Sequence, residues 1–174
     1  MRILATFDGT PYGEATFPTL LELAALPNVE FTLLSIAREP IVHAQFRGEP
    51  RAYTSGQIYG APGTRITPAL PRYPERKDQA IQRSRAELED YLLALASRLP
   101  SGTHVRVEAQ VSDHPARTII ERAREEHPDM IVMASHSREG MLRVFLGSTT
   151  EEVMRSGVAP VLVVHPVGHS ATGD

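Results

Sequence analysis

Two short polar segments of the chain carry residue types that can bind a small anionic ligand. Asp8-Gly9-Thr10 follows an apolar run near the N-terminus, and a second polar segment follows another apolar run and ends in Gly147-Ser148-Thr149-Thr150. The second segment offers hydroxyls and leads into a predicted helix, whose free N–H groups and dipole attract anions. Ligands of open parallel sheets bind beyond the carboxyl ends of the strands. We therefore expect both segments to border one site.

Each segment also has a purely structural interpretation. Ser148-Thr149-Thr150-Glu151 has the spacing of a capping box, in which the serine and the glutamate satisfy the first N–H groups of a helix. Asp8 can cap the following helix or stabilise the turn after the first strand. These interpretations remain open beside ligand binding.

Familiar catalytic and metal-binding patterns are missing from the sequence. The chain has no Gly-Lys-Ser/Thr phosphate loop, no Gly-x-Ser-x-Gly elbow and no His-Glu-x-x-His pair. His165 and His169 are four residues apart, but Pro166 and Gly168 prevent the helix that would join them on one metal. We assign no catalytic residue and no metal site, and we do not expect an efficient enzyme.

Composition narrows the function classes further. The 174 residues include 41% hydrophobic and 22% charged residues, which is typical of one globular domain with its own core. A net charge of −3 argues against a nucleic-acid partner or an anionic membrane surface. The chain lacks cysteine and any apolar stretch long enough for a membrane helix, so we expect a cytoplasmic protein.

Strands and helices alternate along the chain, which predicts a parallel sheet covered on both faces. Apolar runs predict strands over 3–7, 29–37, 129–135 and 159–165, and the alternating segment 104–111 predicts a strand at an edge of the sheet. Helices are expected over 11–26, 78–99 and 148–156, and another is expected to begin with Asp113 as its cap. Pro18 should bend the first of these helices near Phe17.

One domain is expected over residues 1–167, interrupted by a Pro- and Gly-rich irregular excursion over 39–77. Residues 168–174 should form a flexible tail.

Several ordered motifs together resemble the universal stress protein family over nearly the whole chain. The family carries a loop of the form Gly, two residues, Gly, nine residues, Gly, Ser or Thr. Here that loop corresponds to Ala134, Ser137 and then Gly147-Ser148. Further resemblance lies in the turn at Asp8, in the helix entry at Asp113-His114-Pro115-Ala116, in the position of Pro18 and in the final strand Ala159 to Val164.

The resemblance implies an α/β, Rossmann-like fold: an open five-stranded parallel sheet in the order 3-2-1-4-5, with helices on both faces. It also implies an adenine nucleotide such as ATP, with the base and ribose near Asp8 and the phosphates on the loop after the fourth strand. The residues carried over as binding residues are Thr6, Phe7, Asp8, Ile36, Met133, Ala134, Ser135, Ser137, Gly147, Ser148 and Thr149.

The chain departs from the family loop at two glycine positions, which are Ala134 and Ser137 here. Glycine permits positive φ and close approach of the backbone to a ligand. Two functions therefore follow from the resemblance: a nucleotide-binding stress protein, or a nucleotide-free dimeric interaction protein with a degraded loop. In either case the resemblance implies a homodimer that pairs the last strand, Ala159 to Val164, with its copy, because an uncovered apolar edge strand is a liability.

Overall fold

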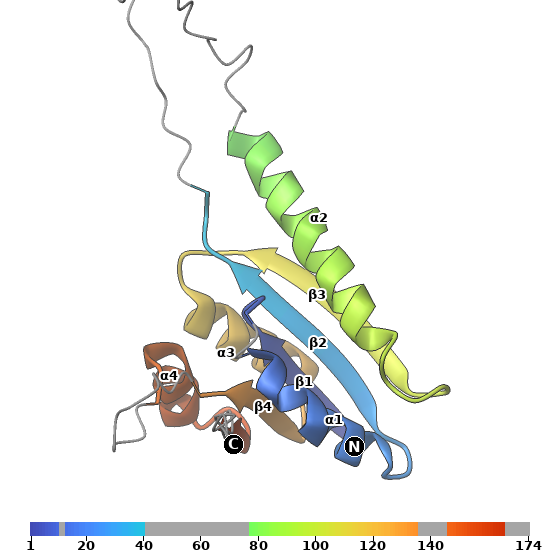
Figure 1. Cartoon of the computed structure of the whole chain (residues 1–174). Helices are drawn as coiled ribbons and strands as arrows, with labels where there is room; N and C mark the ends of the chain where they lie inside the picture. Colours follow the sequence, from blue (N-terminus) through green and yellow to red (C-terminus); the bar gives the residue numbers. More distant parts are fainter. Residues whose placement is uncertain (11–12, 41–76, 136–145, 166–174) are drawn as a thin grey trace, which may run out of the picture.

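The computed structural model describes residues 1–10, 13–40, 77–135 and 146–165. Five strands form one parallel sheet in the order β3-β2-β1-β4-β5 (Figure 1), which confirms the predicted fold class and strand order. Their bounds are β1 Arg2–Phe7, β2 Glu30–Ala37, β3 His104–Val111, β4 Met130–Ala134 and β5 Val161–Val164. The strands β3 and β5 lie at the two edges, as expected for the alternating segment and for the final strand.

Helices cover both faces of the sheet because every central strand is apolar on both faces. The helices α1 (Phe17–Ala24) and α2 (Lys77–Ala96) cover one face, where Leu20 and Leu92 pack on Ile3 and Phe31. The helices α3 (Pro115–Glu126) and α4 (Ser148–Ser156) cover the other face, and their buried residues pack on Leu4, Leu34, Ile131 and Met133. The strand β1 contributes to both cores and is the centre of the fold (Figure 1).

The expectation of one bent helix over 11–26 is wrong. A 3-10 turn over Gly13–Thr16 precedes α1, which begins at Phe17. Pro18 therefore lies in the first turn of α1 and does not bend an ongoing helix. A proline costs nothing there, because the first N–H groups of a helix have no intrahelical partner.

Two predicted helix caps are also wrong. His114, not Asp113, precedes α3, and it makes no side-chain capping bond. Asp113 instead accepts a hydrogen bond from the backbone N–H of Glu39, at 3.2 Å. The capping box at the start of α4 does not form, because Gly147 is the cap residue and Ser148 is already the first helical residue. The boundary residues thus leave both helix starts without a capping side chain.

The ends of β2 and α2 lie close to each other. Lys77 Nζ at the start of α2 is 2.5 Å from Glu39 Oε2, which follows β2. This ion pair, together with Asp113, raises the pKa of Lys77. The excursion predicted over 39–77 and the tail predicted over 168–174 lie, apart from residues 39, 40 and 77, outside the described residues.

Candidate functional site

A cavity of about 700 Å³ opens at the carboxyl ends of β1, β2 and β4, beside the amino ends of α3 and α4. The strand order changes direction between β1 and β4, which is the position where α/β sheets bind ligands. Most of the predicted binding residues line this one cavity: Thr6, Phe7, Asp8, Ile36, Met133, Ala134, Gly147, Ser148 and Thr149. The topology thus brings the two polar segments of the sequence together.

Asp8 forms a tight turn at the mouth of the cavity. Its Oδ1 accepts hydrogen bonds from the backbone N–H of Thr10, at 2.9 Å, and from the Thr10 hydroxyl, at 2.7 Å. Gly13 lies against the same carboxylate, since a Cβ at position 13 would lie 2.3 Å from Asp8 Oδ1. The turn-stabilising interpretation of Asp8 is therefore confirmed, and the carboxylate still faces the cavity.

Apolar side chains from the sheet and from α3 line the inner part of the cavity. Leu34 and Ile36 come from β2, Met133 from β4 and Ile119 from α3. Met133, Leu34 and Ile119 are buried parts of the α3–α4 core. Such a surface can hold a flat, weakly polar group such as a nucleobase.

The start of α4 faces the same cavity with backbone donors. Gly147 precedes the helix in an extended conformation (φ −58°, ψ 150°), and among the described residues no side chain caps the first turn. Thr150 turns inward, where its buried hydroxyl donates to the carbonyl of Ala134 at 3.5 Å. The N–H groups at the start of α4 are thus positioned to meet an anion rather than a capping side chain.

The remaining loop residues differ in placement. Ser135 is fully buried, and its hydroxyl forms a short hydrogen bond with Nδ1 of His165, so its side chain does not line the cavity. Ser137 lies outside the described residues. Ala134 is the last residue of β4 and does not have a positive φ, unlike Asn28 and His127. The backbone strain considered for an alanine at position 134 is therefore absent, although its Cβ remains at the cavity.

Seven lining residues are not among the binding residues predicted from the sequence: Gly13, Leu34, Ala37, Arg38, Pro115, Ile119 and Thr150. Arg38 also lines a smaller adjoining cavity of about 310 Å³ with Arg117, Ser148 and Thr149. Arg38 directly follows the strand predicted over 29–37, and this position could have identified it, because ligands bind beyond the carboxyl ends of the strands. The position of Gly13, in a 3-10 turn, offers no comparable signal.

Tyr91 connects α2 to the strand that carries Asp8. Its ring meets the Phe7 ring edge to face, with centroids 6.4 Å apart. The hydroxyl is buried and has no hydrogen-bond partner in the described parts of the chain. Burial, followed by the nearby carboxylates of Glu14 and Asp8, raises the pKa of Tyr91 to about 12. The phenol therefore stays neutral beside the turn over the ordinary pH range.

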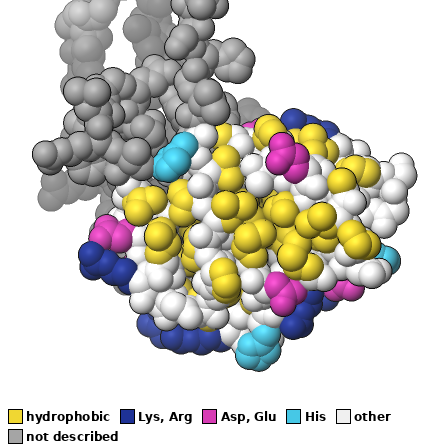
Figure 2. Space-filling model, turned by 90° about the horizontal axis from the view of Figure 1, so that it is seen from below, with side chains coloured by type: hydrophobic (Ala, Val, Ile, Leu, Met, Phe, Trp, Pro, Cys, Tyr) yellow, Lys and Arg dark blue, Asp and Glu magenta, His cyan; other side chains and the backbone are white. Residues whose placement is uncertain are grey.

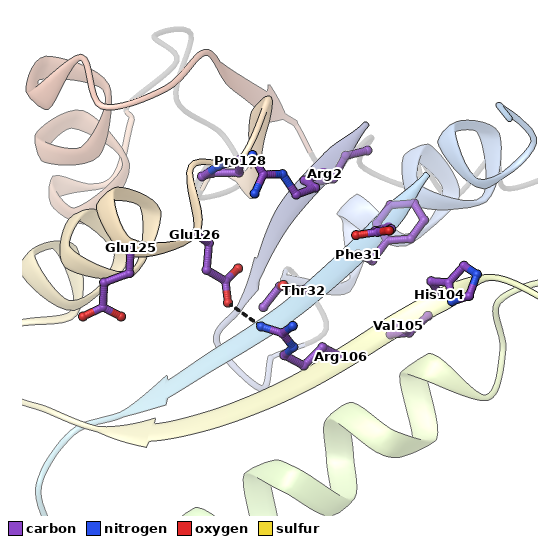
Figure 3. A pocket seen from close by; sticks show the side chains of 11 residues that line it. Arg2, Phe31, Thr32, His104, Val105, Arg106, Glu125, Glu126 and Pro128 are labelled. Carbon is purple, nitrogen blue, oxygen red and sulfur yellow. Dashed lines mark hydrogen bonds and ion pairs between the residues drawn. The ribbon is translucent and has the colours of Figure 1, made fainter. Parts of the chain in front are cut away.

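A second cavity, of about 510 Å³, lies at the opposite, amino end of the strands (Figure 3). Charged groups of both signs surround it, including Arg2, Glu30 and His104. Arg106 points from β3 toward α3, where its guanidinium lies 3.2 Å from the Glu126 carboxylate (Figure 3). The mixed and paired charges do not select one ligand chemistry, so this cavity is the weaker candidate for a binding site.

The family model described as the universal stress protein family matches residues 1–165. The chain belongs to the universal stress protein family. Among curated universal stress proteins, MJ0531 of Methanocaldococcus jannaschii is 42% identical over 50 residues, which is 29% of each chain. The stress response protein NhaX of Bacillus subtilis is 24% identical over 171 residues, covering 94% of this chain and 96% of NhaX.

Solved structures of universal stress proteins share the fold. The structure of MJ0577 superposes with a TM-score of 0.67 at 21% identity, covering 94% of both chains. A universal stress protein in complex with cAMP superposes with a TM-score of 0.57 at 14% identity, covering 96% of this chain and 98% of that one. At these identities the likeness concerns the fold.

The described part of this universal stress protein holds no group of three or more histidine and acidic side chains arranged to bind a metal ion. None of its described helices has the length and apolar character needed to cross a membrane.

Proposed function

We propose that this universal stress protein binds an adenine nucleotide of the ATP class in the cavity at the carboxyl ends of β1, β2 and β4. One observation carries the proposal. The same cavity combines an apolar inner surface, the carboxylate of Asp8 and the uncapped start of α4. These three features suit a base, a ribose and a phosphate chain in that order.

The chemistry of the lining residues favours a different element for each end of the ligand. Phosphates belong at Gly147, Ser148 and Thr149, where N–H groups at a helix start and hydroxyls can donate. Asp8 belongs with the ribose or base, because a carboxylate beside phosphates would repel them. Arg38, which lines the cavity mouth, supplies a positive charge on the same side as Ser148 and Thr149.

The comparisons supply independent support for a nucleotide. The universal stress protein solved with cAMP holds an adenine nucleotide on the same fold. The volume of about 700 Å³ is also within the range of small-molecule pockets, roughly 300–1,000 Å³. Nucleotide binding in the cytoplasm would be coupled to a conformational or assembly change, and hydrolysis is not required for that role.

A second function is a nucleotide-free interaction protein that acts as a dimer. It is favoured by the position of β5, which pairs only with β4 among the described strands and where Leu162 is 37% exposed, and by Met154 on the adjacent α4, which is 42% exposed. Hydrophobic side chains also gather on the lower face of the molecule (Figure 2). Antiparallel pairing of β5 with its copy would cover such an edge with two-fold symmetry.

Calorimetric titration with ATP and AMP tests the first function. Wild type should bind, and Gly147→Val should bind more weakly, since a branched side chain would crowd the phosphates. The Ala134→Gly, Ser137→Gly variant should bind more tightly, because the Cβ at position 134 is removed from the cavity and glycine at 137 restores backbone freedom. Ala134→Gly alone is the matched control that isolates the Cβ effect.

Two results would contradict parts of this proposal. If wild type and the double-glycine variant are both folded and silent at millimolar ATP, nucleotide binding is wrong and the interaction protein is the better explanation. If wild type binds and the glycines add nothing, Ala134 and Ser137 do not impede the ligand.

Sedimentation tests the proposed β5 dimer. Val163→Lys should weaken dimerisation, because a lysine on the final strand would bring two positive charges near the two-fold axis. A wild type that is monomeric at micromolar concentration would rule out this dimer.

A further inference from the structure

The strand β3 is the edge of the sheet opposite β5. In the described part of the chain it pairs only with β2, over the whole of His104–Val111. Its apolar residues lie on the side of α2, and its polar residues lie on the opposite face (Figure 3). An edge strand of this length presents a row of unused N–H and C=O groups to solvent.

The register of β3 with β2 determines which backbone groups point outward. The N–H of Ser112, which continues the strand, donates to the carbonyl of Ala37 on β2 at 2.8 Å. The N–H and C=O groups of successive residues point to alternate sides of a strand. Because those of Ser112 point toward β2, those of Arg106, Glu108 and Gln110 also point toward β2. Val105, Val107 and Ala109 therefore direct their N–H and C=O groups away from the sheet.

These outward groups fit a second copy of β3 in the antiparallel registers that place residues with outward backbone groups opposite one another. One such register places Val107 opposite Val107 of the second copy. Val105 of each copy then lies opposite Ala109 of the other, and the N–H and C=O groups of all these residues point away from β2. Each such pair can exchange two N–H···O=C bonds. The intervening pairs are the ones in which side chains lie closest, with Cα atoms about 4.5 Å apart.

The charges of β3 are complementary in that register. Arg106 lies directly opposite Glu108 of the second copy, and the two-fold axis repeats the pair with the chains exchanged. If the two-fold axis passed through Arg106 instead of Val107, Arg106 would lie opposite Arg106 of the second copy. If it passed through Glu108, the two copies of Glu108 would lie opposite each other. Opposite charges in facing positions stabilise a strand pair and like charges destabilise it. The charges thus select one of the registers that the outward backbone groups allow.

The two faces of the strand are compatible with this partner. Val105 and Val107 are only partly buried against the core under α2, so a second copy would cover them further. On the other face, the side chain of Arg106 is 72% exposed although it contacts Glu126. Its guanidinium has free donors for a second carboxylate.

We propose that β3 pairs antiparallel with β3 of a second copy of this chain, centred on Val107 and fixed by the reciprocal Arg106–Glu108 pairs. This interface is separate from the β5 edge and does not depend on nucleotide binding. With the β5 dimer it would join sheets at both edges and allow assemblies larger than a dimer.

A charge exchange tests the register, with self-association measured by sedimentation at low salt in the Val163→Lys background to remove the β5 contact. Arg106→Glu and Glu108→Arg should each weaken association about tenfold or more, because each places like charges opposite each other twice. The double variant R106E/E108R should restore association to within about threefold of the Val163→Lys parent.

The same variants separate association from folding. Arg106 contacts Glu126, and Glu108 contacts Arg122, within one chain. The charge exchange breaks both of these contacts, so thermal stability should stay lowered in the double variant while association recovers. Association that is unchanged by the single variants, or not restored by the exchange, would overturn the proposal, as would a monomeric Val163→Lys protein at all concentrations.

Crosslinking in an otherwise wild-type chain provides a test that does not need the β5 variant. The chain has no cysteine, so Val107→Cys introduces one thiol per copy. A short bismaleimide should join two copies through position 107. Ser101→Cys is the matched control, because antiparallel pairing already places the two copies of His104, at the start of β3, roughly 20 Å apart along the strands, and Ser101 lies in the turn before that end. Failure at 107, or equal crosslinking at 101, would contradict the antiparallel register.

Discussion

Replacing Gly13 with alanine should displace the carboxylate of Asp8. The new Cβ would lie 2.3 Å from Asp8 Oδ1 and 3.2 Å from the Asp8 backbone nitrogen, so the flexible carboxylate must move. Movement removes the two hydrogen bonds from Thr10, each of which contributes about 0.5–1 kcal/mol at an exposed site. The alanine returns about 0.4–1 kcal/mol by restricting the unfolded chain. The net loss of unfolding free energy is about 0.5–1 kcal/mol.

Chemical denaturation of four proteins measures this conflict directly: wild type, Gly13→Ala, Asp8→Ala and the double variant. With the carboxylate absent, Gly13→Ala should be neutral or slightly stabilising, which gives a coupling free energy of about 1–2 kcal/mol between the two positions. ATP titration should follow the same pattern, with no additional loss of affinity from Gly13→Ala once Asp8 is absent. An equal cost of Gly13→Ala in both backgrounds would refute the argument that Gly13 makes room for Asp8.

Three further changes concern the core that supports the site. Tyr91→Phe should be close to neutral at pH 7, because the buried hydroxyl has no partner among the described residues, and urea denaturation measures this. Since the pKa of Tyr91 is raised to about 12, wild type should lose stability as pH rises from about 10 to 12, and Tyr91→Phe should lack that component of the loss. Leu92→Ala should lower the unfolding free energy by about 2–5 kcal/mol, since Leu92 is fully buried between α2 and the sheet, whereas Leu93→Ala, at an exposed position, should cost less than about 0.5 kcal/mol. Ser35→Ala should cost about 1–2 kcal/mol in thermal denaturation, because the buried hydroxyl donates to the Phe7 carbonyl at 2.9 Å.

The sequence predicted the sheet well because its strands are distinct in pattern. The continuous apolar runs of β1 and β4 indicate strands buried on both faces, and the alternation in β3 indicates an edge with one polar face. The order of the strands came from the family resemblance, since local patterns do not specify which strands are neighbours.

Helix starts were predicted less reliably, for a physical reason. Ser148 and Asp113 are residue types that often cap helices. Capping also requires the residue to lie at the boundary position with non-helical backbone angles, and a neighbouring residue can occupy that position instead. Gly147 and His114 occupy those positions here. The effect of Pro18 was mispredicted for the same reason. A proline is accommodated in the first turn of a helix but bends its interior, so its effect depends on where the helix begins.

The candidate site was predicted by residue type but not completely by shape. The polar turn at Asp8 and the start of α4 were identified because they follow strands on the same edge of the sheet. Ile119 and Pro115 reach the cavity from α3 only through tertiary packing, and Ser135 turns away from it toward His165. Sequence spacing cannot distinguish a serine that faces a cavity from one that is buried beside it.

The contact between Glu39 and Lys77 affects how freely the length of the β2–α2 connection can vary within the family. Both ends of the β2–α2 connection are held at one place by elements that belong to the sheet and its covering layer. The entropy of closing a loop grows only slowly with its length, by about 0.6 kcal/mol for each doubling. Sequence can therefore be gained or lost between these two residues at small thermodynamic cost. Because Arg38 lines the cavity immediately before this point, such changes would alter the entrance to the cavity while leaving its floor unchanged.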